Sequence, residues 1–178
     1  MLPILFAFAI LAVLFVVVIA GRPDGFTVTR ATTISAVPEK VFPHVNELRA
    51  WEAWSTWAKL DPDAKNAFEG PAAGIGAVMS WDGNKKVGAG RMTIIESRPS
   101  DLIRIKLEFL RPFKATNEAV FAFRPEGGQT AVTWSMSGQS NFFFKVFGLF
   151  MDCDKMVGKD FEKGLTSLKS VAETAAKP

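Results

Sequence analysis

Few residues of this sequence could carry chemistry, and their types favour ligand recognition over catalysis. The chain has one histidine, His44, one cysteine, Cys153, and no tyrosine. A general acid–base site needs titratable side chains that face one another in a cavity. The polar residues that the pattern predicts on an inward face are Asn117 and Asp154. We therefore expect no catalytic residue and no cofactor.

Metal and nucleic-acid chemistry are also disfavoured by the composition. One cysteine and one histidine exclude an internal disulfide and a zinc site of the Cys/His kind within one chain. The net charge is +3, but the densest basic pair outside scattered positions is Lys85-Lys86. Nucleic-acid binding needs a stripe of basic residues with stacking aromatic side chains. We expect neither a metal site nor a nucleic-acid partner.

A long C-terminal helix must position Asp154. Between Lys145 and Ala172 the residues at heptad-like spacing fall on one face of a helix, and this stripe comprises Phe147, Met151, Asp154, Gly158, Phe161, Leu165, Leu168 and Ala172. A carboxylate and a glycine are unusual within such a stripe. One interpretation is that the helix packs over a cavity, where Asp154 and Asn117 form the polar pole of an apolar pocket. The alternative is that Asp154 lies at the solvent edge and pairs with Lys155 or Lys159.

The middle of the chain predicts an antiparallel sheet. Strands are expected at 26–34, 76–81, 87–95, 103–109, 113–123 and 132–136, and Asp82-Gly83-Asn84 predicts a hairpin. Ala115, Asn117 and Ala119 are small or polar at inward mid-strand positions, so they leave room for a ligand.

Two short helices are expected between the first strand and the rest of the sheet. One begins at Pro38, and the second, at 46–57, carries Trp51, Trp54 and Trp57 on one side. These rings either form a hydrophobic lid packed on the sheet or the aromatic wall of a binding site. The predicted ligand-binding residues are Trp51, Trp54, Trp81, Phe109, Asn117, Phe121, Trp134, Met136, Met151, Asp154 and Gly158.

The N-terminal run predicts a membrane anchor. Residues 2–21 contain no charged or strongly polar side chain, and at about 1.5 Å per residue they span about 30 Å, the thickness of the hydrocarbon core. The alternative is a cleaved signal peptide, although this run lacks the basic start of one and is longer. Arg22 and Arg30 follow the run, which favours a single-pass protein with its domain, residues 25–175, on the cytoplasmic side. The apolar segment 141–150 either packs on the core or dips into the bilayer interface.

Several segments also carry a family resemblance. Val37-Pro38-Glu39-Lys40-Val41-Phe42, the Trp51/Trp54/Trp57 segment, Gly70-Pro71 through Gly76, Trp81-Asp82-Gly83-Asn84 and 154–162 resemble the polyketide cyclase/dehydrase branch of the SRPBCC (START-like, helix-grip) superfamily. The resemblance covers residues 25 to 172. It implies an α+β helix-grip fold, with a curved antiparallel sheet wrapped around the C-terminal helix. Relatives bind sterols, phospholipids, plant hormones or polyketides in a cavity between the two, and some cyclise or dehydrate polyketides.

Three hypotheses for the function follow. The first is membrane-anchored binding of a hydrophobic small molecule or lipid in an internal cavity, without catalysis. The second is a polyketide cyclase/dehydrase-like enzyme. The third is a membrane-tethered interaction module with a filled core and no ligand. An open cavity of several hundred cubic ångströms is expected only for the first two. The expected partners are an apolar molecule and the membrane.

Overall fold

A computed structural model describes residues 10, 13–21, 23–139 and 153–176 of the chain. After the N-terminal helical residues, the elements in chain order are β1 (Gly25–Ile34), α2 (Pro38–Val41), α3 (Pro43–Asn46), η1 (Leu48–Ala50), α4 (Trp51–Trp54), α5 (Thr56–Leu60), β2 (Lys65–Glu69), β3 (Val78–Asp82), β4 (Ala89–Arg98), β5 (Leu102–Arg111), β6 (Ala115–Glu126), β7 (Gln129–Gln139) and α7 (Cys153–Ala175).

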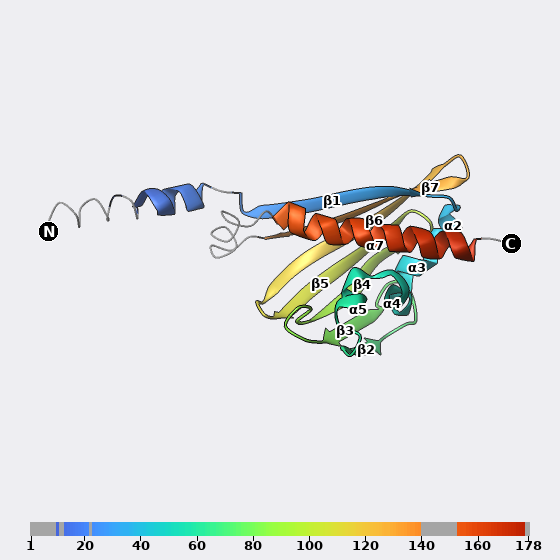
Figure 1. The fold of residues 1–178 in the computed structure, drawn as a ribbon, viewed down its shortest axis with the longest axis horizontal. Helices are drawn as coiled ribbons and strands as arrows, with labels where there is room; N and C mark the ends of the chain where they lie inside the picture. Colours follow the sequence, from blue (N-terminus) through green and yellow to red (C-terminus); the bar gives the residue numbers. More distant parts are fainter. Residues whose placement is uncertain (1–9, 11–12, 22, 140–152, 177–178) are drawn as a thin grey trace.

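The strands form one seven-stranded antiparallel sheet in the order β1-β7-β6-β5-β4-β3-β2. Strands β2 to β7 each pair with their neighbour in sequence. Strand β1 pairs with β7, so β1 and β2 are the two edges of the sheet. Helix α7 runs alongside β1 over one face of the sheet, and the short helices contact it from the same side (Figure 1). We call the face toward α7 the inner face. This arrangement confirms the predicted α+β helix-grip architecture.

Alternation of side chains fixes which residues lie on the inner face. Ile103 and Ile105 on β5 and Ala119, Phe121 and Phe123 on β6 are buried, as the period of two predicts. The prediction was wrong for Phe113, which precedes β6 and is 61% exposed. Pro112 and Phe113 lie in the turn that reverses the chain between β5 and β6, so β6 begins only at Ala115.

The break at Pro43 is expected, since a proline shortens or kinks a helix, but the helix with the tryptophans is more broken than the sequence pattern predicts. The helix expected from Pro38 is divided at Phe42, because Pro43 starts a second helical turn, α3. The helix expected over 46–57 becomes η1, α4 and α5, and buried Ser55 between α4 and α5 has extended backbone angles. Strand β2 was not among the predicted strands, because Phe68 is its one half-buried residue and no alternation marks it.

The core lies between the inner face and α7. Phe161, Leu165, Leu168 and Ala172 of the predicted stripe are at most 2% exposed, and each large apolar side chain buried in this way contributes about 1.5–3 kcal/mol. The period of 3.6 residues therefore identified the buried face of α7 correctly. The stripe residues Phe147 and Met151 lie outside the described residues.

Side chains of α7, and Arg30 of β1 facing it, also bind backbone groups of the edge strand β1 and of Ser35, which follows it. The Lys169 ammonium donates to the carbonyl of Thr33 at 2.8 Å, and Arg30 donates to the carbonyl of Thr29 at 2.8 Å. The Glu173 carboxylate accepts a hydrogen bond from the backbone N–H of Ser35 at 2.7 Å. Helix α7 is therefore fixed to this strand along most of its length.

The predicted anchor falls partly on residues 1–9 and 11–12, which lie outside the described residues. Within the described part of the chain, no helix has both the length and the hydropathy to cross a membrane. The apolar segment predicted at 141–150 also lies outside the described residues. The anchor and its orientation stay predictions.

Candidate functional site

An aromatic cluster fills the inner face toward the middle of α7. It consists of Trp51, Trp54, Phe121, Trp134 and Phe161, which are all at most 6% exposed. The rings of Trp134 and Phe161 stack with centroids 3.9 Å apart, and Phe121 lies 4.7 Å from Trp134 on its strand neighbour. The structure thus brings four predicted site residues together, as tightly packed core. Of the two interpretations of the tryptophan helix, this packing matches the hydrophobic lid for Trp51 and Trp54.

The tryptophan N–H groups distinguish one member of this cluster. Trp51 donates to the carbonyl of Val45 and Trp54 to that of His44, each at 2.9 Å. The buried Nε1 of Trp134 has no acceptor among the described residues. A buried N–H without an acceptor costs about 1–3 kcal/mol.

Next to the aromatic cluster, the inner face is only half-buried. We call this region the half-buried patch, and it consists of Phe26, Met79, Trp81, Leu107, Phe109 and Met136. Trp81 and Phe109 meet edge to face with centroids 5.9 Å apart. Gly90 lies beneath the Trp81 ring, and a Cβ there would overlap it. Three of the predicted site residues beyond the cluster, Trp81, Phe109 and Met136, therefore gather on one apolar surface.

Asn117 supplies an amide group at this patch. It pairs with Gly138 on β7 and with Leu107 on β5, and its Nδ2 lies 3.9 Å from the Met136 sulfur. A Cβ at Gly138 would overlap the Asn117 amide, so the glycine allows the side chain to lie across β7. Asn117 is thus a half-buried polar group beside the side chain of Met136.

Asp154 lies at the solvent edge of α7, where its side chain is 54% exposed. The interpretation that placed it inward beside Asn117 is wrong. Its carboxylate binds Arg30 of β1 through both oxygens, each at 3.0 Å from a guanidinium nitrogen. An arginine on the neighbouring strand satisfies this charge, so the carboxylate has no need of an amide from β6.

Arg30 of β1 was not among the predicted site residues, and the structure places it against α7. Its side chain points to the inner face with Val28, and all five N–H donors are used, on Asp154, on Glu162 and on the carbonyl of Thr29. The hydrogen bonds that Arg30 donates to Asp154 and, to a lesser extent, to Glu162 raise the pKa of Arg30 above its ordinary value. A Cβ at Gly158 would overlap the Arg30 guanidinium. The absence of a side chain at Gly158, which the sequence analysis took as space for a ligand, is thus the space that Arg30 occupies.

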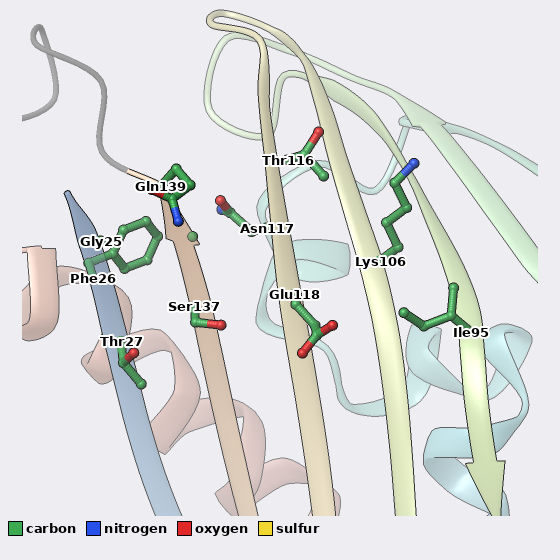
Figure 2. Close-up of a pocket in the computed structure, with 11 residues that line it drawn as sticks. Gly25, Phe26, Thr27, Ile95, Lys106, Thr116, Asn117, Glu118, Ser137 and Gln139 are labelled. Carbon is green, nitrogen blue, oxygen red and sulfur yellow. The ribbon is translucent and has the colours of Figure 1, made fainter.

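A hollow lies at the end of the sheet where β1 begins, and its lining includes Phe26, Asn117 and Gly138. It is an open groove of about 660 Å³. Figure 2 shows Thr27, Ser137, Glu118 and Lys106 on neighbouring strands of this groove. The groove is open to solvent, and polar and apolar groups contribute to its lining in similar measure.

Few titratable groups lie near the inner face. His44 on α3 is half-buried, and burial lowers its pKa. Among the described residues no group of His, Cys, Asp and Glu side chains could hold a metal ion. The predicted site residue Met151 lies outside the described residues. The arrangement can bind and orient an apolar molecule through Asn117, and the described residues form no acid–base pair there.

Comparison with known proteins agrees with this geometry. Residues 25–173 match the family described as polyketide cyclase / dehydrase and lipid transport. No curated protein sequence matches the chain.

Solved structures show the same fold at low sequence identity. The protein CV1439 from Chromobacterium violaceum is 14% identical, with 85% of this chain and 99% of that chain covered and a TM-score of 0.59. The Aha1 dimer from Colwellia psychrerythraea is 17% identical, with 85% and 99% covered and a TM-score of 0.60. The di-domain ARO/CYC BexL from the BE-7585A biosynthetic pathway is 19% identical, with 92% and 53% covered and a TM-score of 0.60.

Proposed function

Because the chain belongs to the polyketide cyclase/dehydrase and lipid transport family of the SRPBCC superfamily, we propose that it binds an apolar small molecule or lipid at the half-buried patch. The observation that carries this proposal is the incomplete burial of Phe26, Leu107 and Met136 on the inner face, beside a fully packed aromatic cluster. Apolar side chains that stay half-buried on the inner face are a surface that a greasy ligand can cover.

The polar groups of the interior define what the ligand should carry. Asn117 offers an amide within the half-buried patch, and in the aromatic cluster the N–H of Trp134 has no acceptor among the described residues. Both groups can donate a hydrogen bond to an oxygen atom. The proposed ligand is therefore an apolar molecule with a carbonyl or hydroxyl oxygen, such as an aromatic polyketide or a fatty acid.

We propose binding without catalysis. Arg30 is the charged inner-face residue of β1, and its guanidinium is already neutralised by Asp154 and Glu162. The polyketide cyclase/dehydrase alternative would need a proton donor or acceptor beside the ligand. Neither Asn117 nor the Trp134 indole titrates in the physiological range. A bound molecule should therefore be released unchanged.

We also propose that residues 2–21 anchor the protein in a membrane with the domain on the cytoplasmic side. The support is the uncharged apolar run itself and the exposed apolar side chains of Val13 to Val18 in the described part of it. The full-length protein should resist extraction from membranes by high salt and by alkaline wash. Release by either treatment would contradict the anchor.

The binding proposal is tested with the full-length protein in mild detergent. The probes are 1,8-dihydroxyanthraquinone and oleic acid, and binding is measured by quenching of tryptophan fluorescence and by the rise in Tm with ligand concentration. Leu107→Trp fills the half-buried patch and should raise the Kd at least tenfold. Leu110→Trp is the matched control, because Leu110 lies on the same strand with its side chain 55% exposed.

The polar part of the site has its own variant. Asn117→Leu should weaken binding of the hydroxyanthraquinone about two- to tenfold, the value of one net hydrogen bond. Equal affinities for the parent, Leu107→Trp and Asn117→Leu would exclude the half-buried patch as the site. Absence of binding to any probe would favour the filled interaction module.

A further inference from the structure

Two neighbouring connections at one end of the sheet combine exposed apolar side chains with basic ones. They are residues 83–88 between β3 and β4, and residues 110–114 around the turn between β5 and β6. The first contains Lys85 and Lys86, which are exposed. The second contains Leu110 and Phe113, which are 55% and 61% exposed, together with Arg111 and Lys114. We call these two connections the basic–apolar tip.

The strand register places this tip at the end of the sheet where β1 begins. Gly25 of β1 pairs with Gln139, and the adjacent Gly138 pairs with Asn117 near the start of β6. Ala115 then pairs with Phe109 at the end of β5, and Ala89 at the start of β4 pairs with Arg111. Figure 1 shows the N-terminal helix leaving the domain from this same end. The exposed apolar residues of that helix and of the tip thus lie toward one side of the molecule.

The two connections are braced against each other. Gly88 packs so closely on the carbonyl of Arg111 that a Cβ would overlap it. The N–H of Gly83 binds the carbonyl of Gly88 at 2.9 Å, and the Trp81 indole donates to the carbonyl of Val87 at 3.2 Å. The tip is therefore held in shape, which reduces the conformational entropy that it would lose on binding a surface.

The acidic groups beside the tip are engaged locally. Asp82 forms an ion pair with Arg111, and the carboxylate of Asp61 accepts the backbone N–H of Asn84 at 2.6 Å. Among the described residues, Lys85, Lys86 and Lys114 have no ion-pair partner. Within the described part of the chain, the tip therefore combines three lysines that have no ion-pair partner with two exposed apolar side chains.

We infer that the basic–apolar tip is a docking surface for an anionic phospholipid bilayer. Leu110 and Phe113 would enter the interface between headgroups and acyl chains, and the lysines would bind lipid phosphates. Such contact would orient the domain so that the end of the sheet where β1 begins lies against the membrane. The inference adds a second contact to the proposed anchor and involves different residues, and it does not depend on ligand binding.

The test measures whether the tip of the full-length protein enters lipid. In a Cys153→Ser background, Phe113→Cys is labelled with an environment-sensitive fluorophore, and the protein is reconstituted with phosphatidylcholine vesicles with or without phosphatidylglycerol. Arg124→Cys is the control, because it is exposed on β6 toward the opposite end. With phosphatidylglycerol, the label at 113 should shift to the blue and be quenched by lipid-linked nitroxide, and the label at 124 should not.

Charge variants then test the role of the lysines. Each basic residue near an anionic surface changes binding about fivefold, so replacing Lys85, Lys86 and Lys114 with Gln should lower the ratio of inserted to water-exposed label about a hundredfold. Replacing Lys40, Lys59 and Lys163 with Gln removes the same charge elsewhere and should leave the ratio nearly unchanged. A label at 113 that stays water-exposed on anionic vesicles overturns the inference. Insertion that is unchanged in phosphatidylcholine alone, or in the tip variant, overturns the assignment to anionic lipid.

Discussion

The packing of α7 on the aromatic cluster predicts that a glycine-to-alanine substitution within this helix lowers the stability of the protein, which is the opposite of its usual effect. Gly164 lies in the middle of α7, where replacing glycine by alanine ordinarily stabilises a helix by about 1 kcal/mol. Here a Cβ at Gly164 would lie 2.9 Å from Cζ3 of Trp134. Contacts this short do not persist, so either the ring or the helix must move.

The ring has little freedom to move. Trp134 is stacked on Phe161 at 3.9 Å and on Phe121 at 4.7 Å. Adding a methyl group to such a core costs about 1–3 kcal/mol. After the helix-propensity gain of about 1 kcal/mol is subtracted, Gly164→Ala should destabilise the protein by about 1 kcal/mol. For a chain of this size, that corresponds to a fall in Tm of about 2–4 °C.

Trp134→Phe provides the matched background for this measurement. The phenyl ring lacks the outer part of the indole, so the alanine methyl would meet no ring atom at short distance. In this background Gly164→Ala should stabilise the protein by about 1 kcal/mol. Urea unfolding of the four full-length proteins in mild detergent should give a coupling energy of about 2 kcal/mol between the two sites. A stabilising effect of Gly164→Ala in the parent would refute this account of the core.

Two further predictions concern charged groups. Burial lowers the pKa of His44 below its ordinary value of 6.5, so the folded state binds fewer protons there than the unfolded state. The contribution of His44 to stability should therefore decrease as the pH falls below about 6.5, and urea unfolding of His44→Gln as a function of pH should lack that part of the dependence; an identical pH profile for the two proteins would contradict it. Asp154 is exposed and bound to Arg30, so Asp154→Asn should bind 1,8-dihydroxyanthraquinone like the parent and lower the Tm only slightly, as should the control Glu162→Gln. A tenfold loss of affinity in Asp154→Asn, but not in Glu162→Gln, would show that the Asp154 carboxylate takes part in ligand binding.

The buried faces of the long elements could be predicted because they follow from periodicity. Leu165 and Leu168 recur at the helical period, and Ile103 and Ile105 recur at the strand period. Each pattern therefore places its apolar residues on one face of the element, and that face is the buried one. The broken helices could not be placed in the same way. Nothing local marks Ser55 as an extended residue between Trp54, which is buried, and Trp57, which is partly buried against the core.

The candidate site was predictable in composition and not in geometry. The sequence placed Trp134 and Phe121 on the inner face, but whether such rings enclose a cavity or fill it depends on how their volumes fit. Arg30 shares the inward parity of Phe26 and Val28, which was a usable signal. Its partners Asp154 and Glu162 are more than a hundred residues away in sequence, and only the tertiary structure brings them together.

The hydrogen bonds between α7 and β1 have a consequence for crowded copies of this chain. An open sheet offers its edge strands as templates for strand addition, the first step toward fibres. At β1 an incoming strand must compete with Arg30 and Lys169 for the carbonyls of Thr29 and Thr33. At the other edge β2 is five residues long and begins and ends with a charged side chain, so it is a poor template. Both margins of the sheet are thereby protected, and copies gathered at high local density should stay separate instead of joining edge to edge.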